Sequence, residues 1–486
     1  MSGSRRVKKI SGSPTGSLIS ATTGCFMGMT SIALFGPAMH VLKEKLQLGP
    51  VEAAWLIACP VASGSIMRVA FGAYADAVGA VKPFVSLLVL ASCGIFGVAG
   101  MMLQLSTGAE DVGGPISAGE RLLSELVDVA NSTAVASGPA PGTYSGLLAL
   151  GVLAGFGIAT FTVGVGQIAY WYPKSAQGSV LGVYGGIICA APGVWTMVLP
   201  HMLQEFGLFK TYLCWGCLVL AVVVFYALLG RNSAYFQLRQ QGLDEAEAKE
   251  RAAEKYGQEL FPAANATEGL RIAAGVWKTW ALVCLYFSTF GGMVSLTGWL
   301  PTYWHEVHGV RPTTAGSLAA AFNMGFSVVR AVSGPLSDRL GGEMVLALAL
   351  TLVLVGASTI VASRDFHLDM LGEGLLAVGA GVSTNAVFKL IPHEVPQAVG
   401  GAAGLVGGLG AFGGFVITPC LAAFAHMYGQ EGYSQGFVVF AILALANLGL
   451  TLALYCTSGD EASSEEWETD SDSELVDGCD LEDLKR

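Results

Sequence analysis

Long apolar stretches recur along the whole chain, and each is separated from the next by a short polar, glycine-containing or proline-containing break. Uninterrupted apolar runs of about 18 residues or more are typical of helices that cross a membrane. We count twelve such runs, which predict an all-α membrane protein with twelve transmembrane helices. They lie at residues 17–41, 52–75, 83–105, 145–170, 178–200, 211–230, 277–300, 315–337, 343–362, 370–390, 399–424 and 433–456.

Two longer polar segments interrupt this series. The segment Ser106–Tyr144 is rich in Gly, Ser and Pro and contains the sequon that begins at Asn131, a candidate glycosylation site. The segment Arg231–Val276 separates six spans from six spans, and its charged stretch Asp244–Tyr256 predicts a helix. The expected organisation has five parts. An N-terminal piece (1–16) precedes a six-helix half (17–230) with the outer loop 106–144. A middle loop (231–276), a second six-helix half (277–456) and an acidic tail (457–486) follow.

A twelve-residue cassette occurs twice with identical spacing. The first copy is Arg68-x3-Gly72-x3-Asp76-x2-Gly79, and the second is Arg330-x3-Gly334-x3-Asp338-x2-Gly341. The copies fall in the second and the eighth span, six spans apart. This spacing indicates two six-helix halves related by a duplication.

A glycine pattern repeats with the same offset. Gly178, Gly182, Gly185 and Gly186 in the fifth span match Gly400, Gly404, Gly407 and Gly408 in the eleventh span. Small residues at such spacing let transmembrane helices approach closely. Parallel halves related by an axis along the membrane normal are typical of the major facilitator fold, in which substrate binds near the midplane between the halves.

Composition excludes a soluble multidomain protein, because 53% of the residues are hydrophobic and only 13% are charged. The net charge of −11 is concentrated in the tail after Thr457, where twelve acids and two bases contribute −10. That tail alternates Ser with acidic residues and is typical of a disordered segment, either plainly solvated or a substrate for acid-directed kinases. Cysteines show no metal-ligand grouping, and neither a cofactor nor a nucleic-acid partner is expected.

The distribution of basic residues predicts the orientation. An even number of spans places both termini on one side, and most Lys and Arg residues lie on that side, chiefly in the N-terminal cluster and the middle loop. Because basic loops favour the cytoplasmic side, we expect both termini in the cytoplasm, in the plasma membrane. We expect a monomer.

The two arginines carry the candidate chemistry. From Arg68 to Asp76 is eight residues, roughly 12 Å along a helix, so each arginine is expected near the middle of a core about 30 Å thick. An arginine there costs about 2.5–3.5 kcal/mol and normally faces a cavity or a partner. Candidate acids such as Glu306 and Glu373 fall near span ends, so no carboxylate is expected to neutralise the arginines or to carry a proton at midplane. The planar guanidinium suits an oxyanion held by two hydrogen bonds; the alternative is that each arginine caps backbone carbonyls.

Other residues have two interpretations each. Asp76 and Asp338, with Arg339, could form a cytoplasmic gate that closes in one transport state, or static salt bridges. Aromatic residues at Phe161, Tyr286 and Phe290 could sandwich a planar anion, although aromatics in spans more often serve packing.

Three blocks of the sequence resemble the nitrate/nitrite porter family of the major facilitator superfamily. They are Ala154–Gly186, Leu285–Pro301, and Val387–Pro392 continuing through Gly400–Phe415. The resemblance implies that Arg68 and Arg330 clamp nitrate or nitrite and that the three aromatic residues named above surround it. In the first glycine signature two positions depart from the family pattern, since Tyr184 and Cys189 stand where asparagines are usual. In the tenth span Ser383-Thr384-Asn385 stands where the family has Gly-Asn-Gly.

These observations predict a secondary transporter for nitrate, nitrite or both, driven by proton symport or by anion exchange, and no enzymatic activity. Two alternatives remain: a porter for another small anion such as a monocarboxylate, and an anion sensor that does not transport. Transport measurements with competing anions separate the three.

Overall fold

The computed structural model describes residues 9–107, 142–262, 266–333, 341–395 and 399–457. Every regular element in these ranges is a helix, as predicted. The first group of elements, here called the N-terminal half, comprises α1 (Pro14–Met29), η1 (Thr30–Ala33), η2 (Gly36–Ala38), α2 (Met39–Leu46), α3 (Pro50–Val78), α4 (Val81–Thr107), α6 (Thr143–Ala154), η3 (Gly155–Ala159), α7 (Thr160–Trp171) and α8 (Lys174–Leu229).

The second group, here called the C-terminal half, follows the middle loop. It comprises α12 (Trp277–His308), α13 (Pro312–Val332), α15 (Gly342–Ala362), α16 (Phe366–Glu394), α17 (Val399–Ala411), α18 (Gly413–Tyr428), α19 (Gln430–Gln435) and a last helical stretch, 438–457.

The number of membrane crossings agrees with the prediction. Among the described residues, eleven helical segments are long and apolar enough to span a membrane, and one of them, Val180–Leu229, has 50 residues. A straight helix of that length would measure about 75 Å, more than twice the apolar thickness of a bilayer. The segment bends at Gly207, whose φ of 73° favours glycine, so it makes two crossings and the described residues make twelve.

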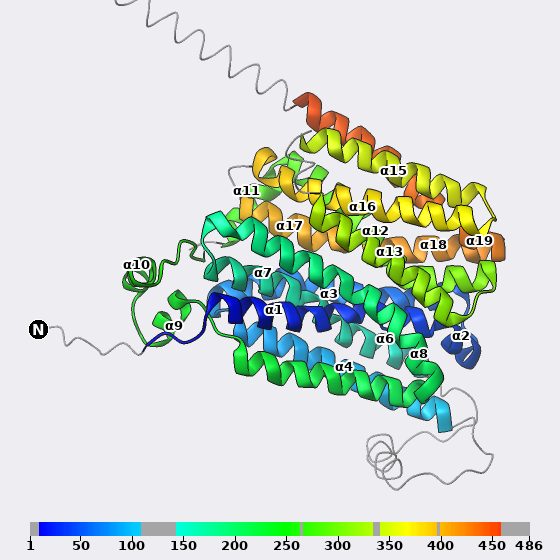
Figure 1. The fold of residues 1–486 in the computed structure, drawn as a ribbon, viewed down its shortest axis with the longest axis horizontal. Coiled ribbons are helices and arrows are strands. Elements are labelled where there is room, and N and C mark those ends of the chain that lie inside the picture. The colour runs from blue at the N-terminus through cyan, green and yellow to red at the C-terminus, as the bar shows by residue number, and fades with distance from the viewer. Residues whose placement is uncertain (1–8, 108–141, 263–265, 334–340, 396–398, 458–486) are drawn as a thin grey trace, which may run out of the picture.

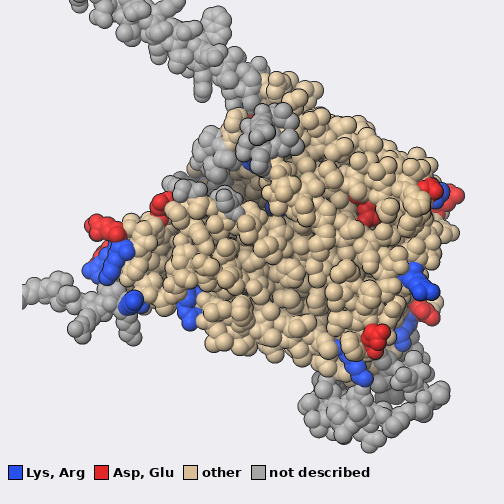
Figure 2. All heavy atoms as spheres, in the orientation of Figure 1, with Lys and Arg blue, Asp and Glu red and all other residues tan. Residues whose placement is uncertain are grey.

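The two ends of the bundle are easily told apart. Figure 1 shows α9 (Ala234–Gln240), α10 (Glu245–Tyr256) and α11 (Ala266–Gly275) at one end, here called the inner end, together with both ends of the described chain. The opposite, outer end carries α2 and α19. In Figure 2 the charged side chains gather at these two ends, and the broad face between them is almost free of charge. This belt is what a protein embedded in lipid requires, because exposed charge in hydrocarbon is costly.

The middle loop contains the charged helix that the sequence predicts. Helix α10 begins after Asp244, whose carboxylate accepts a hydrogen bond from the N–H of Glu247 at 2.7 Å. Such a side-chain cap satisfies one of the free N–H groups at a helix start. Its buried Ala248 and Ala252 pack in a small apolar cluster with α9, so the loop is folded against the inner end.

Contacts between the halves follow the duplication. Helix α3 of the N-terminal half packs on α17 and α18, and α8 packs on α13 of the C-terminal half. In each case the helix that carries the arginine cassette in one half packs on the helix that carries the glycine pattern in the other half. The seam between the halves is therefore lined by the two repeated motifs.

Candidate functional site

Both cassette arginines lie inside the bundle at this seam. Arg68, on α3, is 2% exposed, and Arg330, near the end of α13, is partly buried. No acidic side chain forms an ion pair with either arginine in the part of the chain that the structure describes. Within these residues, as the sequence led us to expect, no carboxylate neutralises either guanidinium group; the binding role of the two arginines stays a prediction.

Arg68 is fixed by groups from both halves. Its Nη1 donates to the backbone carbonyl of Gly407 on α17 at 3.2 Å, and its Nη2 lies 4.0 Å from the sulfur of Met29. The centre of the guanidinium lies 5.1 Å from the ring centroid of Phe161 and 5.5 Å from that of Phe290. Ring faces attract cations at such distances. The Nε of Arg68 has no hydrogen-bond partner, so the guanidinium keeps a donor for a further ligand.

Arg330 makes the matching contacts from the other half. Its Nη1 lies 3.2 Å from the sulfur of Cys189 on α8, three residues beyond Gly186. Its guanidinium centre lies 5.7 Å from the ring centroid of Phe290, the ring that Arg68 also contacts. Each arginine thus reaches across the seam toward the glycine-patterned helix of the opposite half, and Phe290 contacts both cations.

Aromatic residues of α12 form one wall of the site. Tyr286 and Phe290 stack with ring centroids 4.9 Å apart at an angle of 12°, and Phe388 of α16 meets Tyr286 edge-on at 5.0 Å. The Tyr286 hydroxyl lies close to Arg330 but has no partner that meets hydrogen-bond geometry. It is a second polar group that a ligand could satisfy.

The electrostatics of this arrangement favour an anion. Two guanidinium groups contact one aromatic ring inside the bundle, where like charges repel more strongly than in bulk water. The sulfur atoms and the carbonyl that the arginines contact carry only partial negative charge and do not neutralise them. A small anion between the groups would relieve the repulsion and take up the free donors of Arg68 and Tyr286.

Sequence reasoning did not identify several of these neighbours. Met29, Phe388 and the carbonyl of Gly407 carry no signal in a single sequence, because only the packing brings them to the arginines. Cys189 did carry one, as a departure from the family pattern, and the structure places it against Arg330. Tyr184, the other departure in the first glycine signature, donates its hydroxyl hydrogen to the carbonyl of Phe161 at 3.2 Å.

The glycine pattern shows close approach at some positions and open space at others. A methyl group on Gly408 would lie 2.9 Å from Val69 of α3, and one on Gly186 would lie 3.3 Å from Ala331 of α13. Gly182 and Gly185 have nothing within 4 Å of that position, and the nearest atoms to Gly404 and Gly407 are 3.8 and 3.7 Å away. A conformational role for all six glycines stays a prediction.

The predicted gate residues are only partly described. The Asp76 carboxylate accepts a hydrogen bond from the Tyr170 hydroxyl at 2.7 Å, within the N-terminal half, so a tyrosine takes the place where a base was expected. Asp338 and Arg339 lie outside the described residues, as do Asn131 and the acidic tail beyond Thr457. Their roles stay predictions.

The outer end of the seam is closed by polar and backbone contacts. Lys43 of α2 forms an ion pair with Glu306 of α12 at 2.7 Å and a hydrogen bond with Tyr433 of α19 at 2.7 Å. Below this pair the backbones of Gly36 and Gly298 touch, since a methyl group on Gly36 would lie 2.6 Å from the Gly298 carbonyl oxygen.

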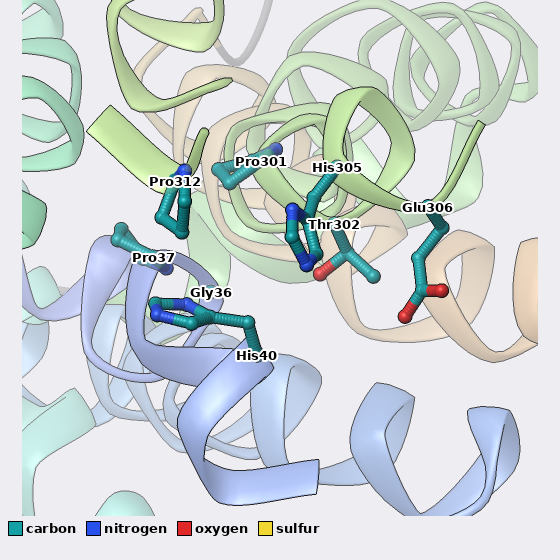
Figure 3. A pocket seen from close by; sticks show the side chains of 8 residues that line it. All are labelled: Gly36, Pro37, His40, Pro301, Thr302, His305, Glu306 and Pro312. Carbon is teal, nitrogen blue, oxygen red and sulfur yellow. The ribbon is translucent and has the colours of Figure 1, made fainter. Parts of the chain in front are cut away.

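A narrow crevice opens on the outer side of that contact. Figure 3 shows His40 on one wall, and Thr302, His305 and Glu306 together with Pro301 and Pro312 on the other. Gly36 and Pro37 also line the crevice. It marks where the two halves would separate if the seam opened outward.

Comparison with known proteins places this architecture. The profile of the Major Facilitator Superfamily matches residues 21–417, with a second match over 306–473. A protein of Thermus thermophilus named "Probable nitrate/nitrite antiporter NarK1" is 25% identical over 446 residues, covering 87% of each chain. The "Nitrite extrusion protein" of Bacillus subtilis is 28% identical over 310 residues, covering 64% of this chain and 71% of that protein.

Two further similarities extend the picture. The "Probable nitrate/nitrite transporter NarK2" of Mycobacterium tuberculosis is 24% identical over 416 residues, covering 85% of this chain and 89% of that protein. Among solved structures, the xylose transporter XylE from E. coli, in a partially occluded inward-open conformation, matches with a TM-score of 0.63 at 13% identity. That match covers 91% of this chain and 97% of XylE, and it shows the fold alone.

Proposed function

Because the chain belongs to the Major Facilitator Superfamily, as an integral multi-pass membrane protein, we propose that it transports nitrate, nitrite or both by alternating access of a site between its two halves. The curated relatives reported above are named as nitrate or nitrite transporters, which supports this substrate class. Neither they nor the superfamily are enzymes, and this chain is not an enzyme.

The observation that carries the proposal is the paired arginine site. Arg68 and Arg330 contact one shared ring, Phe290, and neither has an acidic partner among the described residues. Nitrate and nitrite are small planar oxyanions whose oxygen atoms match the donors of a guanidinium fork. The flat faces of Phe161 and Phe290 suit a planar ion that has lost its water. Tyr286 supplies a neutral hydroxyl donor on the same wall.

Conformational exchange follows from the placement of the site. The two arginines come from different halves, so an anion between them draws the halves together through their charge. Closure at Val69–Gly408 and Gly186–Ala331 requires the small glycine side of each contact. Separation of the Lys43–Glu306 pair would open the outer crevice. The gate role of Asp76, Asp338 and Arg339 at the inner end is part of this proposal.

The energy source and orientation are proposed on physical grounds. Import of one negative charge against an inside-negative potential costs about 2.3 kcal/mol per 100 mV, which cotransport of protons or exchange for an outgoing anion can supply. We place both termini and the middle loop in the cytoplasm because those segments carry most of the basic residues. The plasma membrane is the proposed location, and the monomer the proposed functional unit.

Uptake of isotopic nitrate and nitrite into proteoliposomes tests the proposal, with and without a pH gradient and with internal nitrite for exchange. We expect saturable uptake of each anion, and we expect each anion to inhibit uptake of the other. Monocarboxylates in excess are expected to leave it unchanged. If neither anion moves while it still binds, the chain is a sensor; if carboxylates move instead, the substrate assignment is wrong.

A further inference from the structure

A second cluster of buried titratable groups lies at the outer end of the C-terminal half, between α12 and α16. Asp369 is 0% exposed and Glu373 is 4% exposed, and the two lie one helical turn apart on α16. Tyr303, Trp304 and His308 face them from α12. The sequence places Glu373 near a span end, and the packing of α12 buries it.

The hydrogen bonds of the cluster are incomplete. Oδ2 of Asp369 accepts from the Tyr303 hydroxyl at 2.6 Å and lies 2.9 Å from Nε2 of His308. Oδ1 of Asp369 is buried and has no hydrogen-bond partner among the described residues. Oε2 of Glu373 accepts from the indole N–H of Trp304 at 2.6 Å. Two carboxylates thus share three donors, of which only His308 can carry a positive charge.

The surrounding elements add no compensating charge. The α19 region contributes Ser434 and the ring of Phe437, which lies 5.2 Å from that of Tyr303. Helix α15 faces this part of α16 with Gly356 and Ile360, and α13 meets α16 further inward. Neither Lys nor Arg pairs with the two acids in the described part of the chain.

Charge balance therefore requires a bound proton. Burying an ionised carboxylate whose one partner is a neutral N–H is costly, and protonation removes that cost. One imidazolium can neutralise one carboxylate, and His308 lies against Asp369. The closed cluster is neutral when His308 and Asp369 form an ion pair and Glu373 holds a proton.

The same helix end joins this cluster to the seam. Glu306, which pairs with Lys43 of the other half, lies one turn beyond Tyr303 on α12. Thr302 of the crevice is the residue before Tyr303. Any movement of the α12 end that separates Glu306 from Lys43 also moves the α12 side chains of the cluster and lets water approach it. The His308 side chain, 9% exposed, is its member nearest to solvent.

We propose that Glu373 takes up a proton from the outer solution when the outer seam closes and returns it when the seam opens. The inference rests on the alternating access proposed above. The step forms and breaks only the O–H bond of the Glu373 carboxyl group, and water or His308 on the outer side passes the proton. Because the closed state binds more protons than the open state, rising pH favours opening.

The direction of the pH dependence distinguishes Glu373 from a titratable pair at the seam itself. His40 and His305 face each other across the crevice with ring centroids 5.9 Å apart. Protonation of both imidazoles would make them repel, so this pair would open the seam at low pH. Glu373 would open it at high pH.

Accessibility of the seam tests the proposal without depending on the substrate. A Thr302→Cys chain in sealed vesicles is labelled from the outer side with a membrane-impermeant maleimide, with the unsubstituted chain as baseline. The pH dependence of the maleimide–thiol reaction itself is measured on a small thiol, and each labelling rate is divided by that rate. For one proton, the open-to-closed ratio changes by at most about tenfold per pH unit. Between about pH 5.5 and about pH 8.5 we therefore expect labelling to rise by at least about tenfold and by no more than about a thousandfold.

Two variants complete the design. Glu373→Gln imitates the protonated acid, and we expect low labelling that no longer depends on pH. Glu52→Gln removes an exposed carboxylate at the same end of the molecule and is expected to behave as the Thr302→Cys parent. Labelling that falls as pH rises, or that keeps its pH dependence in Glu373→Gln, overturns the proposal.

Infrared spectroscopy of the purified protein gives a readout that survives a folding defect in the labelled variants. We expect a carbonyl band of a buried protonated carboxyl group near neutral pH, lost in Glu373→Gln and kept in Glu52→Gln. Absence of this band from the unsubstituted protein also overturns the proposal. A chain that fails to move nitrate or nitrite but shows the band and the labelling pattern contradicts the proposed function alone.

Discussion

The two halves of the molecule share an anion-binding motif but differ in their acids. Arg68 and Arg330 occupy equivalent positions, and each reaches across the seam to the glycine-patterned helix of the opposite half. Asp369 and Glu373 belong to the tenth span, and the equivalent fourth span, Thr143–Trp171, contains neither Asp nor Glu. A ligand at the axis between the halves contacts both copies of a motif, so both copies are needed. A residue buried inside one half can differ from its equivalent in the other half without affecting that shared site.

Even the two arginines are not in identical surroundings. Arg68 is enclosed by two aromatic rings and a backbone carbonyl, while Arg330 is partly exposed and contacts a thiol. The duplication therefore conserves the charge and its position, and the individual halves adjust what surrounds it. The predictions that follow test how far this equivalence extends.

Replacing either arginine by lysine is expected to have the largest effect. Lysine keeps the charge but loses the planar fork, and loss of a bidentate charge-assisted contact of about 2–3 kcal/mol corresponds to a fall of roughly 100-fold in transport efficiency. Arg68→Lys and Arg330→Lys are compared by isotopic exchange, with Arg364→Lys at the exposed outer end as control. An effect confined to one of the two arginines would show that the site is not symmetric.

Phe290 contacts both arginines and Phe161 contacts only Arg68, so the two rings can be compared by substitution. Phe290→Leu removes the cation–ring contact of both arginines, and at about 1 kcal/mol for each contact we expect roughly 30-fold weaker anion binding. Phe161→Leu removes a contact of Arg68 alone and is expected to cost about fivefold. Binding of nitrite to the detergent-solubilised protein measures both. Equal effects would indicate that Phe290 serves only one arginine.

The glycine pattern can be tested at one close and one open position. Gly408→Ala would place a methyl group 2.9 Å from Val69 across the seam, and overpacking costs about 1–3 kcal/mol. We expect turnover to fall about fivefold. Gly404→Ala, with its nearest atom 3.8 Å away, is expected to leave turnover within about twofold. Equal turnover of the two variants would mean that the close contact does not limit the transport cycle.

The smallest effect is expected at the outer ion pair. Lys43→Met removes the charge that joins the halves, and a partly exposed pair contributes about 0.5–1 kcal/mol. We expect labelling of the Thr302→Cys background from outside to rise about threefold. Lys45→Met is the matched control, because Lys45 donates to the backbone of Leu105 within its own half. Unchanged labelling in Lys43→Met would show that the Gly36–Gly298 contact closes the seam without the ion pair.

The sequence by itself determined the spans, the duplication and the two arginines. Apolar runs of bilayer length have few alternatives to a membrane helix, and Arg68 and Arg330 stand out because a charge inside such a run requires a partner. The bend at Gly207, between two predicted spans, and the Asp244 helix cap follow from local chemistry, which a single sequence contains.

Only the tertiary structure decided which groups meet. The shared ring of Phe290, the thiol of Cys189 beside Arg330 and the Lys43–Glu306 pair each join residues far apart in the chain. Glu373 shows the same limit, since the sequence places it near a span end but does not show that Trp304 of another helix packs against it and that it is buried. Burial and pairing depend on what covers a side chain, and in this protein the covering residues come from other helices.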